Sequence, residues 1–164
     1  MSQAITGVSP PAAVETTIMT TWPSMGATPF GQTLGRLYSI RAGIGNILTI
    51  GNLIALASIP QALLIFALNI LPWSCVRYRL TNRRVVKEVG LKGKVDKEVA
   101  LANFDRVETV VQPGQEWFPC GDLVFYNGNV ETFRLTGVPH PEGFRNTCLK
   151  AARGAAGVKK ALAK

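Results

Sequence analysis

Residues 77–90 read RYRLTNRRVVKEVG, and this stretch decides the fold that the sequence predicts. Aromatic and β-branched residues alternate with charged residues on both sides of Thr81-Asn82. Such alternation is typical of two half-buried strands joined by a turn. Turn signals, strongest at Asn127-Gly128, recur at the spacing of a small antiparallel barrel or sandwich. The strands that we expect are Arg77–Leu80, Arg84–Val89, Glu98–Leu101, Arg106–Gln112, Asp122–Tyr126 and Val130–Leu135.

The segment before this stretch is apolar. The 35 residues between Arg41 and Arg77 carry no charge, and Ile and Leu recur throughout them. An apolar run of roughly 18 residues or more is typical of a membrane-embedded helix. Charged residues make up only 17% of the chain, below the roughly 25% usual in a globular domain. We therefore expect residues 34–76 to lie in a bilayer, with a helical hairpin buried inside a folded domain as the alternative.

The length of the apolar run favours two membrane arms over one. A straight helix of this length would measure about 52 Å, whereas the hydrocarbon core is about 30 Å thick. Pro60 removes a backbone donor and disfavours helix at the preceding residue, which predicts a break at Ser58–Gln61. Basic residues flank the run on both sides, and they favour the cytoplasmic face. We expect a hairpin that enters and leaves on that face, with one kinked span as the alternative.

Small and polar residues inside the run indicate a helix–helix contact. The residues are Gly45, Asn46, Thr49 and Asn52. The three polar ones recur every three residues and would share one helical face. Small residues allow close approach there, and the polar side chains can hydrogen-bond across to a second helix. We expect a helix seam; the alternative, a conduction path, lacks the ionisable residue that would support it.

The basic residues after the run form the candidate binding site. They are Arg77, Arg79, Arg83, Arg84, Lys87, Lys92 and Lys94. Each basic group near an anionic leaflet contributes about 1 kcal/mol of attraction. We expect them to hold the β domain against anionic lipid or a partner. The narrower alternative is a defined pocket for an anionic headgroup at the open end of the barrel, near Thr81–Arg84 and Leu91–Lys94. Nucleic acid is not expected, because the stretch lacks the interleaved aromatic residues of a stacking platform.

The two ends of the chain differ from its middle. Residues 1–33 are rich in Pro, Thr and Gly and contain no Lys or Arg, and we expect one short strand near Thr16–Thr21. From Pro141 onward the apolar residues follow helical spacing, which predicts a helix that covers the open end of a barrel. Gly154 and Gly157 weaken its continuation, so residues 154–164 are predicted to form a basic tail.

The sequence holds no motif of a known catalytic chemistry. Nucleophile elbow, phosphate-binding loop, dinucleotide fingerprint and zinc-protease motif are all absent from it. Its single histidine, His140, lies between two prolines. Cys75, Cys120 and Cys148 form no C-x-x-C pair, so we expect free structural thiols, as in a reducing cytoplasm. We predict no enzymatic activity, no cofactor and no metal site.

The stretch that opens the β region resembles a known family. Residues 78–86, YRLTNRRVV, followed by Gly90, are similar to the strand–turn–strand that opens the bacterial pleckstrin-homology-like (PH-like) domain, in its YdbS-like membrane class. Residues 98–107 and 121–125 resemble later strands of that family. The resemblance covers residues 36–152. It implies a bent antiparallel barrel capped by a C-terminal helix and tethered to the cytoplasmic membrane, and it implies no general catalytic site.

Together these expectations describe an α+β membrane protein. An apolar helical hairpin at residues 34–76 precedes a PH-like antiparallel β barrel with its C-terminal helix at residues 77–153; the N-terminal segment 1–33 and the basic tail 154–164 flank them. We expect a non-enzymatic scaffold or adaptor at the cytoplasmic face of the inner membrane, with the lipid bilayer and an unidentified protein as partners. The alternative function is a small pore or transporter accessory subunit, a homo-oligomer assembled through the hairpin.

Overall fold

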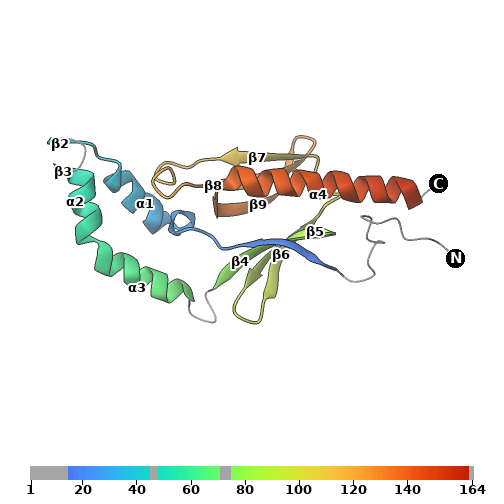
Figure 1. Cartoon of the computed structure of the whole chain (residues 1–164), viewed down its shortest axis with the longest axis horizontal. Helices are drawn as coiled ribbons and strands as arrows, with labels where there is room; N and C mark the ends of the chain where they lie inside the picture. The colour runs from blue at the N-terminus through green and yellow to red at the C-terminus, as the bar shows by residue number, and fades with distance from the viewer. Residues whose placement is uncertain (1–14, 45–47, 71–74, 163–164) are drawn as a thin grey trace, which may run out of the picture.

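The computed structural model describes residues 15–44, 48–70 and 75–162, whose strands form two antiparallel sheets and a short ribbon. The first sheet has the strand order β1-β4-β5-β6, with β1 Thr17–Thr21, β4 Val76–Thr81, β5 Arg84–Val89 and β6 Lys94–Ala100. The second sheet has the order β7-β8-β9, with β7 Arg106–Val110, β8 Cys120–Asn127 and β9 Val130–Pro139. Figure 1 shows helix α4, Pro141–Leu162, packed along the second sheet, with the helices α1 to α3 at the opposite end from the termini.

The strands predicted from the alternating pattern are confirmed, because each predicted range overlaps an observed strand. Leu80 of β4 lies opposite Val85 of β5, and both side chains face the core. The hairpin predicted at Asn127-Gly128 joins β8 to β9, where Gly128 adopts a φ of 61°. The short strand expected near Thr16–Thr21 is β1, which pairs with β4 at the edge of the first sheet.

The core lies between the two sheets and under α4. It contains Tyr78, Leu80 and Val85 from the first sheet, Leu123, Phe125 and Leu135 from the second, and Phe144 and Cys148 from α4. The Phe125 ring lies between those of Phe104 and Phe133, with centroid distances of 5.0 and 5.6 Å. Each large apolar side chain buried in this way contributes about 1.5–3 kcal/mol. The shared core therefore holds both sheets and the helix together.

The barrel predicted from the strand spacing does not close. Within the residues that the structure describes, β6 pairs with β5 alone and makes no ladder to the second sheet. Residues 94–98 of β6 are exposed and mostly charged, so they offer little apolar surface that could bury a further strand. The chain instead crosses to the second sheet through residues 101–105, where Leu101 and Phe104 are buried, and α4 supplies Phe144 to the core.

The membrane hairpin predicted for residues 34–76 is wrong. The segment forms α1 Pro29–Tyr38, the ribbon strands β2 Gly43–Ile44 and β3 Leu48–Thr49, then α2 Ile50–Ala57 and α3 Ile59–Ile70. Thr49 interrupts the first predicted arm, because its hydroxyl accepts from the Asn52 amide at 3.2 Å and caps α2. Ser58 ends α2, as the predicted break required. In the described part of the chain, none of the helices has both the length and the apolar character that crossing a bilayer demands.

The segment before α1, residues 17–27, contacts both sheets and so links them. After β1 the chain makes the short 3-10 helix η1, Met25–Ala27, which lies against β8 and β9. The Ser24 amide donates to the Gly137 carbonyl at 2.8 Å. A Cβ on Gly26 would lie 2.6 Å from the Cys120 sulfur, so this close approach requires glycine. Part of the predicted N-terminal segment 1–33 thus belongs to the folded unit.

Helix α4 begins at Pro141, as predicted. It continues through Gly154 and Gly157 to Leu162, into the residues predicted to form a tail. Each helical glycine costs about 1 kcal/mol relative to alanine. Ala151, Ala152 and Ala155 pack against the core, and this packing, together with the alanine-rich composition, offsets that cost.

Candidate functional site

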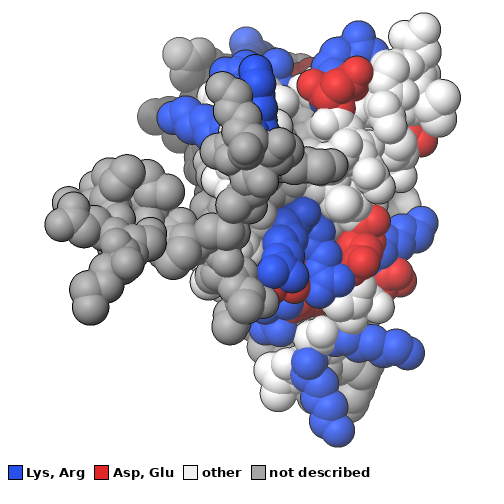
Figure 2. Space-filling model, turned by 90° about the vertical axis from the view of Figure 1, so that its right-hand side faces the viewer, with Lys and Arg blue, Asp and Glu red and all other residues white. Residues whose placement is uncertain are grey.

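The predicted basic residues lie together on the first sheet. Their positions are Arg77 and Arg79 on β4, Arg83 in the turn, Arg84 and Lys87 on β5, Lys92 in the next turn and Lys94 on β6. Acidic side chains lie among them. Figure 2 views the end of the molecule that holds the termini, and there Lys and Arg are interspersed with Asp and Glu instead of forming one continuous basic surface.

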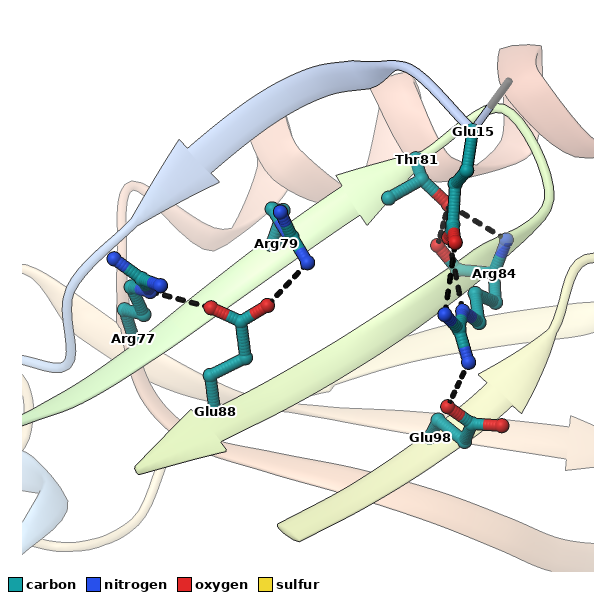
Figure 3. Close-up of polar contacts among 7 residues, drawn as sticks. All are labelled: Glu15, Arg77, Arg79, Thr81, Arg84, Glu88 and Glu98. Carbon is teal, nitrogen blue, oxygen red and sulfur yellow. Dashed lines mark hydrogen bonds and ion pairs between the residues drawn. The ribbon is translucent and has the colours of Figure 1, made fainter. Parts of the chain in front are cut away.

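Two of the arginines bind a buried carboxylate. Glu88 lies directly opposite Arg77 in the β4–β5 ladder, and its side chain is only 1% exposed. Arg77 and Arg79 each form an ion pair with it, one on each carboxylate oxygen (Figure 3). A buried carboxylate needs such partners, because an unpaired charge away from water is strongly unfavourable. These two guanidinium groups, each about a third exposed, are therefore largely engaged within the sheet.

A second cluster ties Arg84 to the start of the described chain. Arg84 donates to both carboxylate oxygens of Glu15, each at 2.8 Å, and pairs with Glu98 on the neighbouring strand (Figure 3). The Thr81 hydroxyl lies 2.8 Å from the same Glu15 carboxylate. The hydrogen bonds from Arg84, followed by that from Thr81, lower the pKa of Glu15 to about 2. The same pairing raises the pKa of Arg84.

The tip of the β5–β6 hairpin carries two exposed basic residues of the predicted set. Lys92 and Lys94 are exposed, and within the described ranges neither belongs to an ion pair, whereas Lys87 pairs with Asp96 at 3.0 Å. Leu91, at the same tip, is 73% exposed. The Gly90 amide donates to the Cys75 carbonyl at 2.7 Å, which places this tip beside the end of the apolar segment.

Helices α2 and α3 form an exposed apolar arm, here defined as residues 50–70. Its exposed apolar side chains are Ile50, Leu53, Leu56, Ile59, Leu63, Leu64 and Phe66. Leu56 and Leu63 are 66% and 63% exposed, although the arm contains no charged residue. Contiguous apolar surface of this kind marks a site of interaction with a protein or a membrane. In Figure 1 the arm projects from the side of the two sheets.

The arm is fixed to the second sheet through α1. The Tyr38 ring packs edge-on against Trp117 of the β7–β8 connection, with centroids 5.4 Å apart, and its hydroxyl bonds to Ser58 between α2 and α3. A Cβ on Gly35 would lie 2.0 Å from the Gly114 carbonyl oxygen, so the α1 backbone touches that connection directly. The arm therefore has a defined position relative to the sheets.

The predicted seam residues do not share a helix. Gly45 and Asn46 lie outside the described residues. Thr49 belongs to β3 and caps α2, and of the described pair only Asn52 is helical. Both line a cavity of about 660 Å³ that also borders on Tyr38 and Trp117. The pore or transporter-subunit alternative depends on the predicted membrane hairpin, which the observed helices do not form. The role of these residues in assembly stays a prediction.

A further groove of about 630 Å³ lies between α4 and the chain linking β6 to β7. Leu101 and Phe104 contribute to its floor, and Ala152 and Ala155 of α4 form its opposite side. Its polar lining residues are Asn82, the predicted site residue Arg83, Asp105 and Arg153. The sequence pattern could place Arg83 in a turn, but the groove depends on how α4 packs, which the local pattern does not contain.

The side chains with catalytic or metal-binding potential are dispersed. Burial raises the pKa of the Cys148 thiol to about 12 and also raises the pKa of Cys120, so both are protonated at neutral pH. His140 occupies the turn before α4 with a φ of 45°. In the described parts of the chain, His, Cys, Asp and Glu form no group of three that could hold a metal ion.

Comparison with known proteins identifies one family. A family model described as bacterial PH domain matches residues 31–152. This range contains the arm, both sheets apart from β1, and the first half of α4. No curated protein and no solved structure matches the chain.

Proposed function

Because the chain belongs to the bacterial PH domain family, we propose that it is a non-enzymatic adaptor that docks on the cytoplasmic face of the inner membrane. Helices α2 and α3 lie in the outermost part of one leaflet, and the two sheets remain outside it and present a surface to a protein partner. PH-like domains are in general binding modules, which supports the adaptor role. The proposed docking does not require a helix that crosses the bilayer.

The observation that carries the proposal is the exposed apolar arm. Covering one Leu or Phe side chain fully contributes about 1.5–3 kcal/mol. Leu56, Leu63 and Phe66 are each more than half exposed. An apolar helix that remains uncovered in water is strongly unfavourable, so a helix of this composition is expected to be buried in some partner phase.

The distribution of the exposed side chains favours lipid over a protein partner. Leu64 and Phe66 are 62% and 56% exposed. Side chains two positions apart point about 160° apart around a helix. A protein surface covers one stripe of a helix, whereas a helix that is apolar on all sides is typical of burial in lipid or in a large protein core. The arm leaves and rejoins the folded domain at α1 and β4, which agrees with immersion from one side.

Basic residues at the β5–β6 tip add an electrostatic contribution. Lys92 and Lys94 lie on the same hairpin tip as Gly90, whose amide bonds to Cys75, five residues after the end of the arm. Each would contribute about 1 kcal/mol near an anionic leaflet. The exposed Leu91 at the same tip can enter the headgroup region with them. The free cysteines fit the reducing compartment on that side of the membrane.

Vesicle flotation tests the proposal. The protein is expected to float with vesicles that contain phosphatidylglycerol, and the variant Leu56→Glu with Leu63→Glu is expected to stay at the bottom of the gradient. Val111→Glu with Val130→Glu is the matched control, because these valines are 48% and 67% exposed on the second-sheet side. Flotation of the arm variant at the level of the unchanged protein would contradict membrane docking by the arm.

The second candidate is self-association, in which the arm of another copy provides the cover. Size-exclusion chromatography with light scattering separates the two. If the unchanged protein is an oligomer that binds no vesicles, and the arm variant is a monomer, the arm is the contact of a homo-oligomer.

The electrostatic contribution has its own test. Lys92→Glu with Lys94→Glu should reduce binding to anionic vesicles and leave binding to neutral vesicles unchanged.

A further inference from the structure

The cavity at the base of the arm is formed where α1, the start of α2 and the β7–β8 connection meet. Its volume is about 660 Å³, within the range of roughly 300–1,000 Å³ that is usual for small-molecule sites. Its lining comes from residues 38–41, from Thr49 and Asn52, and from Glu116 and Trp117. The cavity therefore lies between the arm and the second sheet, and it contains one basic and one acidic side chain.

Backbone hydrogen bonds fix the position of the cation in this cavity, Arg41. The Ile50 amide, at the start of α2, donates to the Ala42 carbonyl at 2.8 Å. The next amide, that of Gly51, donates to the Ile40 carbonyl at 3.0 Å. Arg41 lies between these two acceptors in the sequence, so its backbone has a defined place beside α2. Because the first amides of α2 are used in this way, recognition of an anion here depends on the Arg41 guanidinium.

A buried neighbour fixes the anion of the cavity, Glu116. Gln115, the residue before it, is fully buried, and its side-chain amide donates to Asp122 at 2.8 Å. The Phe118 amide donates to the Gln115 carbonyl at 3.0 Å, which closes a turn around Glu116 and Trp117. The exposed carboxylate of Glu116 therefore stands on a backbone that is anchored in the second sheet.

Neither charge is neutralised by the fold. Among the residues that the structure describes, Arg41 and Glu116 belong to no ion pair, either with each other or with a third residue. Trp117 packs edge-on against Tyr38, and 42% of its surface remains exposed. A guanidinium group binds phosphate, and an ammonium group binds a carboxylate or the face of an indole. The cavity is therefore complementary to a zwitterion that carries both a phosphate and an ammonium.

We propose that this cavity binds the headgroup of phosphatidylethanolamine, with the phosphate on Arg41 and the ammonium between Glu116 and Trp117. This rests on the proposed docking, because the arm brings α2, and with it the cavity, to the headgroup layer. The primary ammonium of this lipid has N–H groups that donate to Glu116, whereas the trimethylated ammonium of phosphatidylcholine has none. The site thus distinguishes two headgroups of the same net charge, which the apolar arm and the lysines of the β5–β6 tip do not.

Flotation of the full chain with two sets of vesicles tests the proposal. Both sets contain the same fraction of phosphatidylglycerol, and the remainder is phosphatidylethanolamine in one and phosphatidylcholine in the other. The unchanged protein should bind the first set about threefold more tightly, which is the order expected of one exposed ion pair. Glu116→Gln and Arg41→Gln should each abolish this preference. Using the ratio between the two sets cancels the general effect of a charge change on binding to the anionic lipid.

Matched controls make the same charge changes elsewhere. Glu131→Gln on β9 and Arg153→Gln on α4 alter exposed residues that do not line the cavity, and they should leave the preference unchanged. A preference that survives Glu116→Gln would overturn the proposal, because it would come from the packing of the lipids. Equal binding to both sets would overturn the headgroup site and leave docking by the arm intact. A chain that floats with neither set would instead overturn the docking itself, and the headgroup site with it.

Soluble glycerophosphoethanolamine separates the lipid from a free ligand of the same chemistry. At micromolar concentration it should leave the preference in place, because it lacks the bilayer that holds the lipid headgroup at a high local concentration beside the cavity. If the soluble compound abolishes the preference at that concentration, the cavity is a site for a free zwitterion, and the assignment to a membrane lipid is wrong.

Discussion

Glu15 and Arg84 lie 69 positions apart in the sequence and meet in a bidentate ion pair, with both carboxylate oxygens 2.8 Å from guanidinium nitrogens. The pair joins the chain that enters β1 to the first residue of β5. Bidentate pairing of this kind fixes direction as well as distance.

The Glu15 pair predicts an acid-dependent stability. The pKa of Glu15 is lowered from its ordinary value of 4.5 to about 2 in the fold. The unfolded chain therefore binds the proton more tightly, so the contribution of this carboxylate is present above about pH 4.5 and is lost as the pH falls toward 2. Glu15→Gln should lower the melting temperature at pH 7 and change it little near pH 2.

Thermal unfolding monitored by circular dichroism at several pH values measures this effect. Glu116→Gln, a change of an exposed acid, is the control and should have little effect at any pH. A Glu15→Gln variant as stable as the unchanged protein at pH 7 would show that the pair contributes nothing.

Glu88 should be far more sensitive to substitution than a surface acid. Glu88→Gln removes the charge that Arg77 and Arg79 share, and we expect a loss of about 2 kcal/mol in the free energy of unfolding. Glu131→Gln breaks the exposed pair with Arg134 and should cost less than about 1 kcal/mol. Urea denaturation gives both values, and equal losses would refute the distinction between buried and exposed pairs.

Two glycines offer a matched test of how the arm is attached. Gly35→Ala places a Cβ 2.0 Å from the Gly114 carbonyl oxygen and should push α1 away from the β7–β8 connection. Gly154→Ala in α4 meets open space and should stabilise the helix by up to about 1 kcal/mol. Limited proteolysis should cut the arm faster in Gly35→Ala alone; equal protection of the arm in both variants would show that this contact is unimportant.

The C-terminal helix should depend on one aromatic anchor. Phe144 is 1% exposed within the main core. Phe144→Ala should cost about 3–5 kcal/mol, because the cavity it leaves adds to the lost transfer energy. Val158→Ala, at a position that is 38% exposed on the same helix, should cost under about 0.5 kcal/mol. Chemical denaturation measures both, and a small loss for Phe144→Ala would mean that α4 docks by other contacts.

The strands were predictable because their signal is local. The two-residue alternation in residues 77–90 predicts β4 and β5, and Asn127-Gly128 predicts the turn between β8 and β9. The basic residues of the candidate site follow from the same local pattern. Their partners do not, since Glu15 reaches Arg84 only through the pairing of β1 with β4, a contact between distant segments.

The apolar segment was misread for a physical reason. Its composition predicts that it avoids water, but composition does not determine where helices end. Thr49 and Ser58 cap or terminate helices through their hydroxyl groups, and such residues compete with the helical backbone. The prediction of a closed barrel is wrong for a similar reason. The spacing of the strands does not show that residues 94–98 of β6 are exposed and mostly charged.

Strand β1 occupies one side of β4 through residues that precede the family match. Without β1, the backbone amides and carbonyls on this edge of β4 would lack hydrogen-bond partners. An exposed edge strand can pair with strands of other chains, and this pairing leads to aggregation and fibrils. We therefore expect a truncated chain that starts at residue 31 to precipitate. Strand β1 would then protect the folded chain from aggregation by covering this edge of β4.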